Sequence, residues 1–204
     1  MKRIETKAER EKKQRRNQIV VGVILVAIMV LSTAGYSIMD RSARQQQGRG
    51  ERKQYNNFEF ASSGGLWQLQ NQNFGLVVRY LPQDVENISY SAKLSQNLFS
   101  GREIYFVALN DETKIAANEI ARNLPALRVQ LACLEEQANL AECADLPVKT
   151  CWDILIVINE KKFNNATLVN EGIYQDENCI YIDSTAKNLI RAADRLLFGI
   201  YGII

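Results

Sequence analysis

The stretch NCIYIDSTAKNLIRAADRLLFGIYGI, residues 178–203, predicts a β-strand followed directly by an amphipathic helix. Apolar residues concentrate at 178–183, as they do in strands. From Thr185 onward the apolar residues recur at helical spacing and form one stripe, made of Leu189, Ala193, Leu196, Leu197 and Ile200. Because such a helix packs its apolar stripe against a sheet, this end of the chain predicts an α/β fold.

Segments before this stretch predict more of the same sheet. The run REIYFVAL at 102–109 is rich in strand-forming residues. Asn110 then provides a helix cap, with acidic Asp111 and Glu112 in the first turn, and the helix should end before Pro125. Further strands are expected at LRVQLAC (127–133), DILIVIN (153–159) and NATLVNEGIY (165–174).

The segment DILIVIN has an unbroken apolar centre, which is typical of a strand buried on both faces. A short helix is expected at 134–141, and the strands at 165–174 and 178–183 should pair around Asp176 and Glu177. This order of strands and helices predicts the α/β class, with a mixed sheet packed by helices, and α+β is the alternative.

The domain is expected to open with an antiparallel β-meander. Phe58, Phe60, Trp67 and Leu69 alternate with polar residues around the turn Ser62-Ser63-Gly64-Gly65, and FGLVVRYL at 74–81 should add another strand. This turn is too short for a phosphate-binding loop and lacks the lysine of that motif.

The segment Ile19–Ile38 is 20 residues long and uncharged, the length that a helix needs to cross a bilayer. We therefore expect a transmembrane helix at 19–39, after a basic tail at 1–18 that stays cytoplasmic and contacts anionic lipid headgroups. A signal peptide cleaved after Ala34 is the alternative. Under both readings the rest of the chain is exported, with a flexible stalk at 40–57 and a single domain at 58–204.

Charge divides along the same boundary. Residues 1–53 carry 13 basic and 5 acidic side chains, whereas residues 54–204 carry 12 basic and 18 acidic ones. An acidic domain repels phosphate backbones, so nucleic-acid binding by this domain is disfavoured.

The four cysteines, Cys133, Cys143, Cys151 and Cys179, are expected to form two disulfides in an exported domain. The sequence has no closely spaced cysteine pair and no histidine, so a zinc site or an activated thiol is disfavoured. Three pairings are open, and we favour Cys143 with Cys151 and Cys133 with Cys179.

Other candidate sites have simpler explanations. Ser184-x-x-Lys187 matches a serine-hydrolase spacing without its partner motifs, so Ser184 is interpreted as a helix cap. The two tryptophans, Trp67 and Trp152, and the tyrosines are interpreted as core residues, with a glycan platform as the alternative. Asn87 and Asn165 begin glycosylation sequons. Six carboxylates are interpreted as solvated: Asp145, Asp153, Asp176, Glu177, Asp183 and Asp194.

The segments YLPQDVENI (80–88), CADLPVKTC (143–151) and 178–203 resemble uncharacterised single-pass membrane proteins of small-genome archaea. The final strand and alanine-rich helix are also similar in style to α/β modules of archaeal surface-layer proteins. The resemblance implies a place in the cell envelope and no established activity.

These observations predict a membrane-anchored, non-catalytic binding or scaffolding protein of the cell envelope, with a protein partner there and no cofactor or metal. The alternative is an exported hydrolase acting on glycans, which requires two carboxyl groups about 5 to 10 Å apart in a cleft. A third possibility gives the function to the basic tail, as a contact for lipid or the secretion machinery.

Overall fold

A computed structural model describes residues 19–29, 51–70, 74–162 and 171–204, in a chain that divides into two compact units, residues 1–50 and 51–204. In the first unit, residues 19–29 form a helix whose large apolar side chains are 50% to 73% exposed. No helix among the described residues has the length and hydropathy of a membrane span. The whole predicted tail (1–18) and the second half of the predicted span (30–39) lie outside those residues.

The second unit begins with a four-stranded antiparallel sheet in the order β1-β2-β3-β4. Its strands are β1 (Arg52–Tyr55), β2 (Phe58–Ser63), β3 (Leu66–Gln70) and β4 (Gly75–Val78). The predicted meander is confirmed, and Gly64 and Gly65 turn the β2–β3 hairpin with φ of 59° and 78°. Both residues need the left-handed region that glycine tolerates best.

The domain starts earlier than the predicted boundary at Phe58, because β1, which lies inside the expected stalk, pairs with β2. This edge strand has the sequence RKQY and is mostly exposed, so no apolar alternation marks it in the sequence. Backbone pairing holds it, together with an ion pair between Arg52 and Glu59 at 2.9 Å.

The main sheet has six strands in the order β5-β11-β12-β10-β6-β7. The strands are β5 (Ser89–Tyr90), β6 (Glu103–Val107), β7 (Arg128–Leu131), β10 (Leu155–Glu160), β11 (Gly172–Asp176) and β12 (Cys179–Ser184). Neighbouring strands run parallel except β11 and β12, which form an antiparallel pair. The predicted mixed sheet is therefore confirmed.

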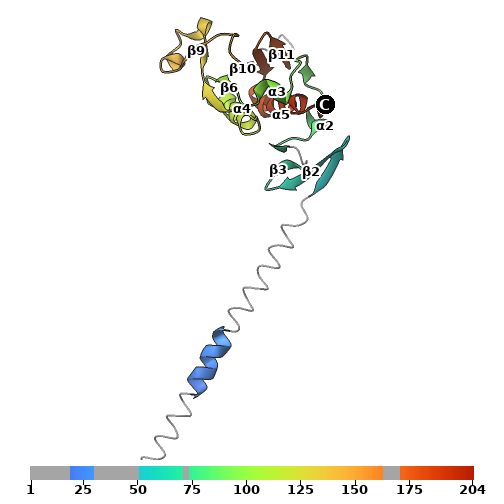
Figure 1. Cartoon of the computed structure of the whole chain (residues 1–204), viewed down its shortest axis with the longest axis vertical. Helices are drawn as coiled ribbons and strands as arrows, with labels where there is room; N and C mark the ends of the chain where they lie inside the picture. The colour runs from blue at the N-terminus through green and yellow to red at the C-terminus, as the bar shows by residue number, and fades with distance from the viewer. Residues whose placement is uncertain (1–18, 30–50, 71–73, 163–170) are drawn as a thin grey trace, which may run out of the picture. The chain divides into compact units, whose positions relative to one another are not determined.

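Two helices, α4 (Asp111–Ala121) and α5 (Leu189–Ile200), pack beside each other against one face of this sheet (Figure 1). Helix α4 starts where predicted, because the Asn110 side chain accepts a hydrogen bond from the Thr113 N–H at 2.8 Å. Helix α5 starts four residues later than predicted, after a 3-10 turn η3 (Ala186–Asn188). The short helices α2 (Pro82–Val85) and α3 (Gln96–Phe99) complete this side.

The two faces of the main sheet belong to separate hydrophobic clusters. Ile156 and Ile158 of β10 pack on the helix side, whereas Leu155 and Val157 point to the opposite face, as strand alternation requires. All four side chains are buried, so the prediction of a strand covered on both faces is confirmed. We call the face opposite the helices the outer face.

Residues 133–151 contribute to the outer face through a small parallel pair, β8 (Cys133–Leu134) and β9 (Val148–Lys149). The helix expected at 134–141 is replaced by two 3-10 turns, η1 (Glu135–Gln137) and η2 (Ala141–Cys143).

Two disulfides are present, as predicted, but their pairing differs from the favoured one. Cys133 bonds Cys143, with Cα atoms 5.9 Å apart, and Cys151 bonds Cys179, with Cα atoms 5.1 Å apart. The turns η1 and η2 fold the chain back, which brings Cys143 to Cys133. Cys151 precedes β10, whose residue Leu155 lies opposite Cys179 in β12. Sheet register therefore sets the second bridge.

Candidate functional site

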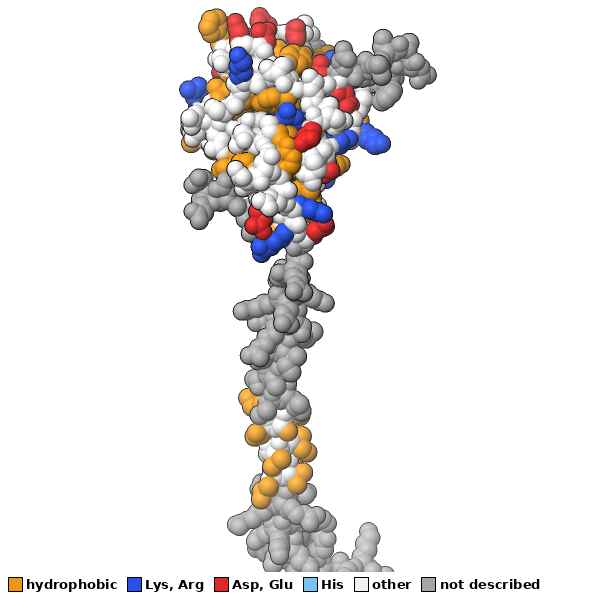
Figure 2. Space-filling model, turned by 90° about the vertical axis from the view of Figure 1, so that its right-hand side faces the viewer, with side chains coloured by type: hydrophobic (Ala, Val, Ile, Leu, Met, Phe, Trp, Pro, Cys, Tyr) orange, Lys and Arg blue, Asp and Glu red, His pale blue; other side chains and the backbone are white. Residues whose placement is uncertain are grey.

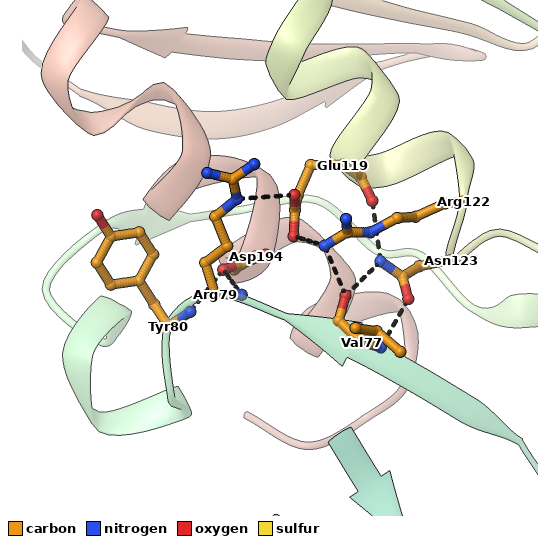
Figure 3. Close-up of polar contacts among 7 residues, drawn as sticks. All are labelled: Val77, Arg79, Tyr80, Glu119, Arg122, Asn123 and Asp194. Atoms are coloured by element: carbon orange, nitrogen blue, oxygen red, sulfur yellow. Dashed lines mark hydrogen bonds and ion pairs between the residues drawn. The ribbon is translucent and has the colours of Figure 1, made fainter. Parts of the chain in front are cut away.

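Asp194 is buried in α5, so its interpretation as a solvated carboxylate is wrong. Its Oδ2 accepts hydrogen bonds from the backbone N–H groups of Arg79 at 3.0 Å and Tyr80 at 2.9 Å (Figure 3). Asp194 follows Ala193 on the buried arc of the helix, where it faces the end of β4. The carboxyl group thus holds the first sheet to the last helix.

A second carboxylate, Glu119 of α4, is also buried and was not among the sequence candidates. Its oxygens are occupied by two guanidinium groups, Arg79 at 3.3 Å and Arg122 (Figure 3). Asn123 adds a reciprocal pair with the backbone of Val77, donating to its carbonyl and accepting from its N–H, both at 2.8 Å. The burial of Glu119 could have been predicted from the sequence, because this residue lies next to Ile120 on the apolar face of α4.

Burial raises the pKa of Asp194 to about 8, against the hydrogen bonds from Tyr80 and Arg79 and with help from the negative charge of Glu119. Asp194 is therefore mostly protonated at neutral pH. Among the described residues its Oδ1 has no hydrogen-bond partner. Because Asp194 is fully buried and Glu119 is held by two arginines, this cluster is structural.

The outer face carries a different arrangement, centred on two stacked tyrosines. Tyr174 of β11 and Tyr181 of β12 lie opposite each other in the antiparallel register, and their ring centroids are 4.9 Å apart at an interplanar angle of 10°. Tyr174 is 40% exposed. The pair is therefore an aromatic ridge that solvent reaches.

A hollow lies on each side of this ridge. The first, of about 450 Å³, is lined by Tyr181 together with Leu134, Glu135, Glu136, Lys149, Thr150 and Cys151. The second, of about 390 Å³, is lined by Tyr174 together with Ser89, Ser91, Glu171, Gly172, Ile173 and Asp183. We call the two hollows and the ridge between them the tyrosine groove.

Carboxylates surround the tyrosine groove. Burial raises the pKa of Tyr181, and the negative charges of Asp176 and Glu136 raise it further. Burial also raises the pKa of Tyr174, with Asp183 adding to the effect. Both phenols are therefore neutral at physiological pH, within a negative local field.

Lys149 and Lys161, which lie near the groove, both form ion pairs. Lys161 pairs with Asp183 at 3.1 Å. Lys149 pairs with Asp153 at 3.3 Å and lies over the ring of Tyr105, 4.2 Å from its centroid.

Glu171 is the most extensively hydrogen-bonded carboxylate of the groove. It accepts from the Ser184 hydroxyl at 3.2 Å, from the Thr185 N–H and hydroxyl at 2.9 and 2.6 Å, and from the Asn188 amide. Burial favours a higher pKa, but the hydrogen bonds, those of Thr185 first, outweigh it and lower the pKa of Glu171. Ser184 is buried and donates to Glu171 instead of capping a helix, and Asn188 is the N-cap of α5.

The remaining sequence candidates are dispersed. Asp145, Asp176 and Glu177 are exposed, and only Asp183 of the predicted carboxylates lines a hollow of the groove. Trp67 packs against the core as predicted, but Trp152 is 90% exposed, one residue after Cys151 of the groove. Its interpretation as a core residue is therefore wrong, since the buried run of this segment begins at Ile154.

Of the two sequons, Asn87 is exposed, and its side-chain oxygen accepts from Arg191 at 3.3 Å. Asn165 lies outside the described residues. The part of the chain that the structure describes contains no group of three His, Cys, Asp or Glu side chains placed to hold a metal ion.

No family model, curated protein or solved structure matches this chain. The resemblance to archaeal membrane proteins stays a prediction.

Proposed function

We propose that this chain is a membrane-anchored protein whose disulfide-bonded α/β domain lies outside the cytoplasm and binds a partner in the cell envelope. The observation that carries the proposal is the pair of disulfides, Cys133–Cys143 and Cys151–Cys179, which leaves no free cysteine in the chain. Disulfides form and persist in oxidising compartments and are rare in the cytosol.

The helix at residues 19–29 supports a membrane anchor. Figure 2 shows hydrophobic side chains along its visible side and no charged side chain among them, whereas the surface of the folded domain mixes both signs of charge with apolar groups. A helix that is apolar all round requires an apolar environment. The sequence continues uncharged to Ile38, and the basic residues before Ile19 favour a cytoplasmic N-terminus.

The tyrosine groove supports binding in preference to glycan hydrolysis. A glycosidase needs a carboxyl group with a raised pKa beside an accessible bond. In the groove, hydrogen bonds lower the pKa of Glu171, whereas the carboxyl group with the raised pKa, Asp194, is buried elsewhere. An exposed aromatic ridge between two hollows is instead suited to holding a ligand.

Protease protection of the full-length chain tests the proposed location. The chain would carry one epitope tag at each end, and protease would be added to intact spheroplasts of an expressing cell. We expect loss of the C-terminal tag and survival of the N-terminal tag. Survival of the C-terminal tag until the membrane is dissolved would overturn the proposal.

A further inference from the structure

The stacked tyrosines of the groove, Tyr174 and Tyr181, each line one hollow. Tyr181 lines one hollow and Tyr174 the other, and Tyr181 also packs against the hydrophobic cluster of the outer face. An aromatic face attracts a cation placed over it. The groove therefore contains two aromatic side chains, each at the edge of a separate hollow.

Carboxylates line both hollows, and the ion-paired Lys149 also lines the first. Glu136 lines the hollow beside Tyr181, while Glu171 and Asp183 line the one beside Tyr174. Asp176 lies close enough to Tyr181 to raise its pKa. Among the described residues, the carboxylates of Glu136 and Asp176 form no salt bridge, in contrast to Asp183, which pairs with Lys161.

We propose that the tyrosine groove binds a basic polypeptide segment, with one lysine or arginine side chain beside Tyr174 and another beside Tyr181. This inference rests on the proposed function, because it names the partner of that binding domain. Charge complementarity favours this occupant over a neutral glycan, because a cation is attracted by the charges of Glu136 and Asp176, whereas a glycan can offer these carboxylates only hydrogen bonds. The excess of acidic residues over residues 54–204, 18 against 12 basic ones, draws the same partner toward the domain.

The test uses the full-length protein in non-ionic detergent and isothermal titration calorimetry. The probe is a blocked peptide of alternating glycine and basic residues that contains two lysines and one arginine. Two comparison ligands are a peptide with glutamate at the basic positions and a neutral hexasaccharide. We expect binding of the basic peptide alone, with an affinity that falls as salt is raised, because exposed charges are screened.

Single substitutions locate the binding site. Asp176→Asn and Glu136→Gln remove exposed charges, and each should weaken the peptide about threefold, the range of an exposed ion pair. Tyr174→Leu should weaken it by a similar factor, about threefold, through loss of the cation–π contact. The matched control is Glu112→Gln, an equal change of charge on the exposed side of α4, which should leave the affinity unchanged.

Three results would overturn the inference: no binding of the basic peptide, equal weakening by Glu112→Gln, or hexasaccharide binding that is lost in Tyr174→Leu. The second would show attraction to the acidic domain as a whole, and the third would make the groove a glycan site. These outcomes are independent of the spheroplast result. If the domain is cytoplasmic and binds the peptide, only the proposed location is wrong. If the domain is exported and does not bind the peptide, only this inference is wrong.

Discussion

Replacing Asp194 with asparagine should change how the stability of the domain depends on pH. In the folded protein the pKa of this carboxyl group is about 8, against 3.8 for an ordinary aspartate. The folded state therefore retains a proton that the unfolded chain releases. Its stabilising effect is complete below pH 3.8, is lost progressively as pH rises, and is gone above pH 8. Between these values the free energy of unfolding falls by about 1.4 kcal/mol per pH unit because of this group.

Asp194→Asn keeps an oxygen for the N–H groups of Arg79 and Tyr80 and removes the titration. The difference in free energy of unfolding between the variant and the wild type should therefore shift by about 2.7 kcal/mol in favour of the variant when the pH is raised from 5 to 7. The assay is urea unfolding of the full-length protein in detergent at both pH values, followed by tryptophan fluorescence. Asp176→Asn, an exposed carboxylate, is the control and should show no such gain. Parallel pH dependence in the wild type and Asp194→Asn would refute the assigned role of Asp194.

Three further changes test other parts of the structure. Gly199→Ala should cost about 2 kcal/mol in the same unfolding assay, because a Cβ there meets the ring of Tyr90, whereas Gly75→Ala meets nothing within 4 Å; equal stability of the two variants would contradict the packing of α5 on β5. Removing Cys151–Cys179 by paired serine substitution should destabilise the domain by about 1 kcal/mol more than removing Cys133–Cys143. The Cys151–Cys179 bridge closes the longer loop, with a separation of 28 residues against 10. The reverse order of stability would argue against this pairing. In a host that glycosylates exported proteins, Asn87→Gln should lower the mass of the protein by one glycan, and an unchanged mass would show that Asn87 is not modified.

The sequence was informative wherever one pattern dominated a segment. The unbroken apolar run around Ile156 predicted the central strand β10, and Asn110 with its acidic neighbours predicted the start of α4. Strand β1 was not predicted, because its sequence RKQY has no apolar pattern and backbone pairing with β2 holds it in place. The disulfide pairing was not predicted for a similar reason. The sheet register places Cys179 beside β10, and the spacing of cysteines along the chain does not reveal that register.

The candidate site was less predictable than the fold. Tyr174 and Tyr181 are seven residues apart, and only the antiparallel register of β11 and β12 stacks their rings. Burial of Asp194 depends on its helix meeting the end of β4, a contact between segments separated by more than 100 residues. Trp152 shows the opposite case, because a residue type that is mostly buried on average is 90% exposed here.

Peptide mapping of the disulfides tests the central claim most directly. The full-length protein would be taken from its native membrane with free thiols blocked at lysis, digested without reduction and analysed by mass spectrometry. We expect the linked peptides Cys133–Cys143 and Cys151–Cys179, with Ile19–Ile38 retained in the chain. Four blocked thiols would place the domain in a reducing compartment and contradict the proposal of an exported, membrane-anchored binding domain.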